Sequence, residues 1–128
     1  MKKIIGEEFK DSKIIFKIED KFLFNKKEYE ESININKISK IEKILESGFD
    51  NEITCIIFYQ KLTDVEGICI DTLDDEIKNN EAMIELIKEK SVLYKIPASR
   101  YIGKITELFD KIIANLDINN IEIIETII

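Results

Sequence analysis

Residues 53–59, with the sequence ITCIIFY, constrain the fold more than any other part of this chain. These seven residues carry no charge, and most of them are β-branched or aromatic, which is the pattern of a strand buried on both faces. Such a strand normally lies in the interior of a sheet. We therefore expect residues 53–59 to form a central strand, and the rest of the chain to pair with it or pack on it.

The length and composition are sufficient for one self-standing core. The chain has 128 residues, of which 45% are apolar, and a chain of this size buries about two-thirds of the surface that it exposes when unfolded. We expect residues 1–128 to form a single α+β domain that requires neither a disulfide nor a metal ion to fold.

The N-terminal part of the chain alternates apolar and polar residues with the period of a strand. Ile14, Phe16 and Ile18 point to one face, with Lys13, Lys17 and Glu19 between them, and Phe22 and Phe24 continue that face after the polar stretch 19–21. We predict a hairpin that turns at 19–21, then a second turn at 25–27 that leads into a third strand. Together these segments form a meander with one solvated face.

Three helices are predicted from apolar residues that recur every three or four positions. The first covers residues 38–48 and ends at Gly48, and the second begins at residue 74 or 80 and ends at residue 90. The third has the clearest apolar stripe; it starts from a cap at Ser99 and keeps its spacing from Ile102 to Leu116.

Short apolar runs predict three more strands, at residues 67–70, 91–96 and 121–128. The first of them is expected to form an antiparallel hairpin with residues 53–59. The fold class that follows is α+β: a single domain with a mostly antiparallel sheet, made of an N-terminal meander plus a central hairpin, and about three helices packed on it.

The residue types that carry the commonest catalytic chemistry are missing from the sequence. There is no His, which excludes Ser-His and Cys-His nucleophile pairs and removes the commonest zinc ligand. No glycine-rich phosphate-binding motif is present. Cys55 and Cys69 lie in strand-like runs, and we interpret them as buried, reduced thiols. We expect no enzymatic activity, no cofactor and no metal ion.

The N-terminal residues lack the apolar core of a signal peptide, and no run approaches the roughly 20 apolar residues of a membrane span. We therefore expect a cytoplasmic protein that does not use a membrane as its partner.

The formal net charge of -7 is concentrated in the middle of the chain. Residues 49–97 carry 11 acidic residues against 5 lysines, whereas residues 1–48 carry 10 against 11. An acidic field repels phosphate backbones and attracts basic surfaces, so we expect a basic protein as the partner and no direct binding of nucleic acid. The carboxylates expected to contact this partner are Asp64, Glu66, Asp71, Asp74, Asp75, Glu76, Glu81 and Glu85.

These features predict a small acidic protein that acts by protein–protein binding. Immunity proteins, antitoxins and phage-encoded inhibitors of nucleic-acid-acting enzymes have this character, because their carboxylates occupy the places where the target binds phosphates. The dense acidic run at residues 71–76 is compatible with two alternative roles. It suits a helix N-terminus, which favours negative charge, and its oxygen-rich spacing could hold a hard cation.

Two further hypotheses rest on other parts of the chain. Arg100 is the only arginine, and with Tyr94 and Tyr101 it could read an anionic ligand, although an ordinary surface salt bridge explains it equally simply. The apolar run 121–128 is expected in the interior of the sheet; at an edge, it would mediate a homodimer or assembly as a structural or adaptor subunit.

Overall fold

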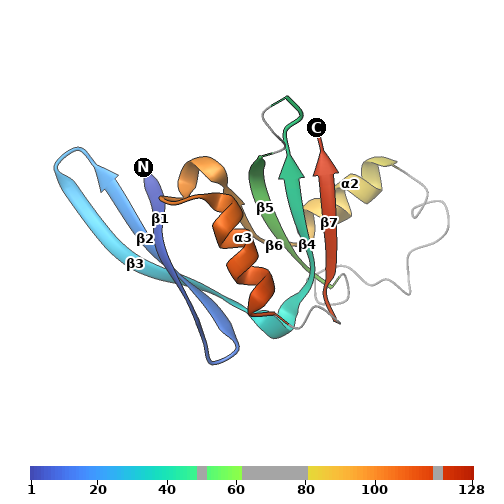
Figure 1. Ribbon diagram of the computed structural model, residues 1–128, viewed down its shortest axis with the longest axis horizontal. Helices are drawn as coiled ribbons and strands as arrows, with labels where there is room; N and C mark the ends of the chain where they lie inside the picture. Colours follow the sequence, from blue (N-terminus) through green and yellow to red (C-terminus); the bar gives the residue numbers. More distant parts are fainter. Residues whose placement is uncertain (49–51, 62–80, 117–119) are drawn as a thin grey trace.

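The computed structural model describes residues 1–48, 52–61, 81–116 and 120–128. This part of the chain is mostly strand, arranged in two sheets with two α-helices (Figure 1). The first sheet has the order β1-β2-β3 and the second the order β6-β5-β4-β7. The elements are β1 (Lys2–Lys10), β2 (Lys13–Phe22), β3 (Asn25–Asn34), η1 (Ile35–Lys37), β4 (Ile38–Leu45), β5 (Ile53–Gln60), α2 (Glu81–Lys90), β6 (Val92–Pro97), η4 (Ala98–Arg100), α3 (Ile105–Ala114) and β7 (Glu122–Ile127).

The N-terminal part of the chain forms a three-stranded antiparallel meander, but both predicted turns are wrong, because residues 19–21 belong to β2 and residues 25–27 belong to β3. β2 continues through residues 19–21 without a turn, and the chain reverses at Leu23 and Phe24 instead. The polar stretch stays extended because β2 is the middle strand, paired antiparallel with β1 on one side and β3 on the other. Lys21 also pairs with Glu19 along this stretch, at 3.2 Å. The sequence pattern does not reveal β1.

The strand β4 occupies the place where the sequence predicts the first helix, so the described residues contain two α-helices rather than three. Ile38, Ile41 and Leu45 face the core, and their spacing of three and four residues imitates a helix. This spacing arises because the pairing of β4 with β5 shifts register twice, between Ile38 and Lys40 and between Ile44 and Leu45. Each shift interrupts the strict alternation of faces along a strand.

The central strand is confirmed. β5 lies between β4 and β6, and its side chains are buried on both faces. Ile56 and Phe58 belong to the main core, whereas Ile57 and Tyr59 form a second, smaller cluster with Cys55 on the opposite face. In the described part of the chain, β4 and β6 are the two strands that pair with β5. The strand predicted at 67–70, which was expected to form a hairpin with residues 53–59, lies outside the described residues.

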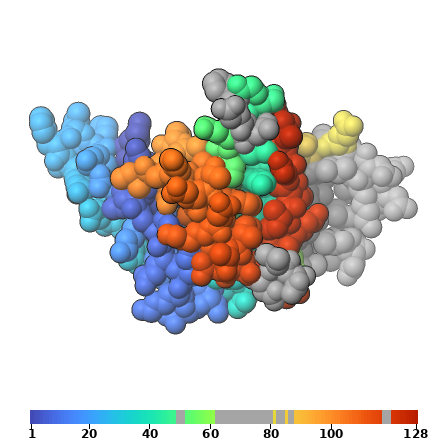
Figure 2. Space-filling model, viewed as in Figure 1, coloured from blue at the N-terminus to red at the C-terminus, as the bar shows by residue number. Residues whose placement is uncertain are grey.

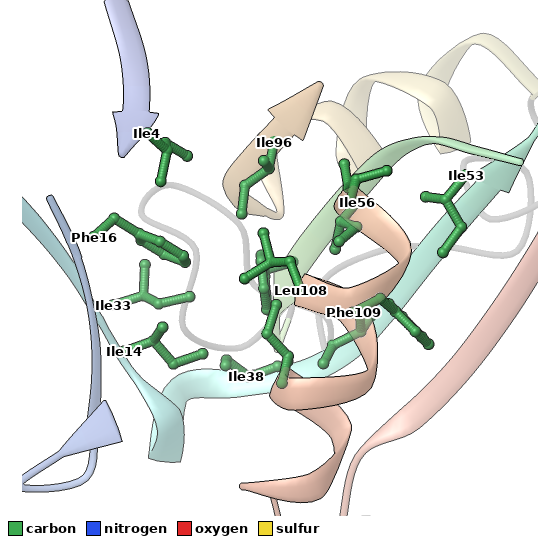
Figure 3. Packing of buried hydrophobic residues seen from close by; sticks show 14 of the residues in the cluster. Ile4, Ile14, Phe16, Ile33, Ile38, Ile53, Ile56, Ile96, Leu108 and Phe109 are labelled. Carbon is green, nitrogen blue, oxygen red and sulfur yellow. The ribbon is translucent and has the colours of Figure 1, made fainter. Parts of the chain in front are cut away.

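One cluster of buried side chains joins the two sheets and α3. In Figure 3, Ile4 and Phe16 from the first sheet point towards Ile56 and Ile96 from the second, with Leu108 of α3 between them. α3 covers one face of the second sheet and α2 lies on the other side of it (Figure 1). The second sheet is therefore the middle layer between the two helices.

α3 begins at Ile105 and not at the predicted cap, Ser99. Residues before it are held by β1, because the backbone nitrogen of Ile102 donates a hydrogen bond of 3.0 Å to the carbonyl of Ile4. This link takes the backbone out of a helical path. Ile102, which the predicted stripe places in the core, is 60% exposed, whereas Leu108 is 1% exposed.

The C-terminal strand is also confirmed, but its predicted interior position is wrong. Among the described strands, β7 lies at the edge of the second sheet, and β4 is its single neighbour, paired in parallel. Ile123 and Ile127 are exposed on this edge strand.

The β2–β3 hairpin projects from one end of the molecule (Figure 1). At its turn, Phe22, Leu23 and Phe24 are 71%, 85% and 103% exposed. They do not continue the buried face of β2 as predicted, because the hairpin extends past Lys2, which pairs with Asp20 near the start of β1. Within the described residues, no helix has the length and apolar character needed to cross a membrane.

Candidate functional site

Two of the eight predicted partner-binding carboxylates lie in the described part of the chain. Glu81 and Glu85 belong to α2, and both are exposed. Glu89, which was not predicted, is exposed one further turn along the helix. The spacing of four residues places these three carboxylates, the acidic row, on one face of α2. The other six positions lie outside the described residues: Asp64, Glu66, Asp71, Asp74, Asp75 and Glu76.

Contacts at the C-terminal end of α2 fix the helix to the second sheet. The ammonium of Lys88 lies 3.9 Å from Oε2 of Glu42 and 6.0 Å from the ring centre of Tyr59. Ser91 closes the helix, since its hydroxyl donates a hydrogen bond of 2.7 Å to the carbonyl of Lys88. Lys88, whose side chain is 43% exposed, therefore reaches the sheet from the same side of α2 that carries the acidic row, and the three glutamates are exposed to solvent.

A buried carboxylate lies beneath α2. Glu42 of β4 is 5% exposed, and its Oε1 accepts a hydrogen bond of 2.7 Å from the hydroxyl of Tyr59. Its Oε2 accepts a second one, of 2.5 Å, from the hydroxyl of Thr126. A buried charge is tolerated where hydrogen bonds and a cation compensate for lost hydration, and Lys88 supplies that cation. The residues come from β4, β5, β7 and α2.

In the hydrogen bond between Tyr59 and Glu42, the proton belongs to the tyrosine hydroxyl and the glutamate is ionised. Burial by itself raises the pKa of Glu42, but the hydrogen bonds from Thr126 and Tyr59, with Lys88 and Lys40 nearby, bring that pKa below its ordinary value. Burial, followed by the hydrogen bond to Glu42, raises the pKa of Tyr59 well above that of a free phenol. Glu42 is therefore a carboxylate that accepts hydrogen bonds at neutral pH, and it acts as a charged anchor for three strands and a helix.

Cys55 lies on the same face of β5 as this cluster. It is a free thiol, and its predicted burial is confirmed. Burial raises the pKa of the thiol, while Lys95 lowers it and Glu42 raises it. At neutral pH the group is the neutral thiol and not the thiolate that a nucleophile or metal ligand needs. Cys69 lies outside the described residues.

The structure brings two of the three predicted ligand-binding residues into one hollow. Its lining residues are Lys2, Lys3, Ile4, Ile18, Glu31, Tyr94, Lys95 and Arg100. Four cations therefore face one carboxylate, and Arg100 makes no ion pair within the described residues. The cavity measures about 30 Å³, which is room for about one water molecule. An anion would contact this hollow from the solvent side.

Tyr101 does not share this hollow. Its hydroxyl donates a hydrogen bond of 2.9 Å to Oε2 of Glu7, and the ammonium of Lys111 lies 2.9 Å from Oε1 of the same carboxylate. Burial and the bond to Glu7 raise the pKa of Tyr101 to about 12. Tyr94 instead stacks on Phe16, with ring centroids 5.0 Å apart. Tyr101 therefore contacts β1 through Glu7, which also binds Lys111 of α3, rather than reading a ligand beside Tyr94.

No three His, Cys, Asp or Glu side chains in the described ranges lie close enough together to hold a metal ion. Comparisons with protein-family models, with curated proteins and with solved structures each found no match. Function is therefore inferred from the charges, contacts and exposed surfaces of this chain.

Proposed function

We propose that this protein acts by binding a basic protein, and that the acidic segment containing α2 is its contact surface. The observation that carries the proposal is the acidic row, Glu81, Glu85 and Glu89, exposed along one face of a helix. The row lies in the segment 49–97, where 11 acidic residues stand against 5 lysines. The partner that best suits it is a nucleic-acid-acting enzyme with a basic phosphate-binding surface, which makes the protein an inhibitor of the immunity or antitoxin kind.

The anchoring of α2 supports this function physically. A binding surface that is already ordered loses little conformational freedom on association, and Lys88 of α2 lies 3.9 Å from the buried Glu42 of β4. Opposite charge on the partner accelerates encounter by about 10- to 1,000-fold at low ionic strength. Binding through the acidic row is therefore expected to weaken steeply with added salt.

The test compares two variants with the same change of charge. One carries Glu81→Lys, Glu85→Lys and Glu89→Lys. The control carries Glu107→Lys, Asp110→Lys and Glu122→Lys, at exposed positions on α3 and β7. Each tagged protein is used for a low-salt pull-down from the native host, with elution by a salt gradient and identification by mass spectrometry.

We expect wild type and control to retain one basic protein that moderate salt releases, and the α2 variant to lose it. The purified partner should then lose its own activity on mixing with wild type but not with the α2 variant. Retention of the partner by both variants would rule out α2 as the contact surface. A partner with no basic surface would contradict the proposed mode of recognition.

The edge strand β7 favours a second candidate function, assembly as a structural or adaptor subunit. Its outer edge has no strand partner among the described residues, and such an edge can pair with another chain. Sedimentation velocity over a range of concentrations tests this function. A dimer that dissociates in the variant Ile123→Lys, Ile127→Lys supports it, and a monomer at every concentration contradicts it.

A further inference from the structure

An exposed apolar turn lies at the end of the β2–β3 hairpin. Phe22, Leu23 and Phe24, which we call the apolar tip, are all more than two-thirds exposed, and Phe24 is fully so. In Figure 2 the hairpin forms a protrusion at the far left, away from the part of the molecule that α3 covers. Three consecutive large apolar side chains in water are unfavourable, and such patches commonly mark a contact with another molecule.

The backbone conformation of the turn does not explain why large apolar residues occupy it. Leu23 has a φ of 54°, in the left-handed region that favours Gly or Asn. Tight hairpin turns normally place those residues there, since they adopt the conformation without steric cost. The backbone conformation is therefore unfavourable for Leu23, and the exposure of both Leu23 and Phe24 to water is unfavourable as well. The apolar tip therefore suits a contact rather than folding alone.

Lysines surround the base of the apolar tip. Residues 1–3 and 19–28 contain five lysines and three acidic residues: Lys2, Lys3, Lys21, Lys26 and Lys27 against Glu19, Asp20 and Glu28. Glu19 and Glu28 are already paired with lysines of this group. This end of the molecule is therefore positive, although the chain as a whole is acidic. α2, which carries the acidic row, lies towards the other end of the long axis (Figure 1).

We propose that the apolar tip inserts into the surface of an anionic lipid bilayer, with the lysines at its base contacting the headgroups. Aromatic and aliphatic side chains partition into the interfacial region of a bilayer, and nearby lysines are attracted to its negative surface. A fluid bilayer accepts a convex tip without a preformed pocket. The segregation of charge directs the basic end towards the lipid and keeps α2 in solvent.

A second copy of the chain is a less suitable occupant of the tip. Two tips brought together would bring two groups of lysines together, and like charges repel. The sequence predicts no membrane partner because it has no apolar run long enough to span a membrane. A contact at the bilayer surface does not require such a run. The inference goes beyond the proposed binding of a basic protein and does not depend on it.

A single tryptophan reports directly on insertion, because the natural chain contains none. The variant Phe24→Trp is mixed with vesicles of phosphatidylcholine alone or of phosphatidylcholine with phosphatidylserine. We expect a blue shift of the tryptophan emission with the anionic vesicles and a much smaller one with the neutral vesicles or in high salt. The control Ile127→Trp places the probe at an exposed position on the other sheet, and its emission should not shift.

Vesicle co-sedimentation measures the contribution of each part. The variant Phe22→Ser, Leu23→Asn, Phe24→Ser should remain folded, since the side chains are exposed and Asn tolerates the backbone of position 23. We expect its binding to anionic vesicles to fall at least about tenfold. Lys21→Gln and Lys27→Gln should each weaken binding by about fivefold.

Failure of the wild-type protein to sediment with anionic vesicles would overturn the proposal, as would binding that survives the tip substitutions. Equal binding to neutral and anionic vesicles would overturn the role of the lysines and the choice of an anionic surface. A blue shift of the tryptophan at position 24 that grows with protein concentration, without vesicles, would show a second copy on the tip instead. None of these variants alters α2, so the outcome is separable from that of the pull-down.

Discussion

The hydroxyl of Tyr59 on β5 donates a hydrogen bond of 2.7 Å to the buried carboxylate of Glu42 on β4. The same carboxylate accepts a hydrogen bond from Thr126 on β7, and Lys88 of α2 lies 3.9 Å from it. One charged side chain of β4 therefore contacts two neighbouring strands and the helix that carries the acidic row.

Loss of the tyrosine hydroxyl should destabilise the protein. Tyr59→Phe leaves Oε1 of Glu42 buried without its hydrogen bond, and we expect the free energy of unfolding to fall by about 1–3 kcal/mol. Urea denaturation measures this change. The control is Tyr94→Phe, because the hydroxyl of Tyr94 makes no hydrogen bond in the part of the chain that the structure describes; its effect should stay within about 0.5 kcal/mol. Equal losses in both variants would contradict the assigned role of Glu42.

The same carboxylate should contribute to the acid sensitivity of the fold. The pKa of Glu42 is lower in the folded protein than its ordinary value of 4.5, so the stabilising form is the carboxylate. Its contribution is present above pH 4.5 and is lost as the pH falls through the folded-state pKa. We expect the stability of wild type to fall more steeply below pH 4.5 than that of Glu42→Gln, in urea denaturation at a series of pH values. Parallel curves would show that Glu42 does not contribute.

The contact between Tyr101 and Glu7 should affect the titration of the Tyr101 hydroxyl at alkaline pH. Burial and this contact raise the pKa of Tyr101 from 10.0 to about 12, so the stabilisation is complete below pH 10.0 and is lost as the pH rises towards 12. Glu7→Gln removes the negative charge beside the phenol and should lower its pKa. Phenolate absorbance measures this titration, with Tyr101→Phe to assign the signal. Glu8→Gln, at an exposed neighbouring position, should leave the titration unchanged.

The elements that the sequence predicts correctly have patterns that are complete within one segment. The uncharged run of β5 is one such pattern, and the apolar stripe from Ile105 to Ile112 in α3 is another. β4 is different, because its core residues are spaced by two register shifts in its pairing with β5. The edge position of β7 likewise depends on which strands neighbour it. The pairing between distant segments of the chain cannot be predicted from the spacing of apolar residues within one segment.

The candidate sites also divide into residues that a local sequence pattern identifies and residues whose role depends on distant segments. Glu81 and Glu85 were predicted from charge, and the spacing of four residues could also have identified Glu89. The sequence does not single out Glu42, because residues 38–48 have the apolar spacing of a helix and Glu42 lies outside that apolar stripe. Its burial is decided by Tyr59 and Thr126, which come from other strands. The apolar tip was missed because nothing local shows that the hairpin extends past β1.

The start of α3 provides a direct test of the fold against the pattern. The apolar stripe in the sequence places Ile102 and Leu108 on one buried helix face, but the structure has Ile102 60% exposed and Leu108 1% exposed. Leu108→Ala leaves a cavity between the two sheets and should lower the free energy of unfolding by about 2–5 kcal/mol. Ile102→Ala should change it by no more than about 0.5 kcal/mol. Comparable losses in urea denaturation would mean that Ile102 is buried and that the helix begins near Ser99.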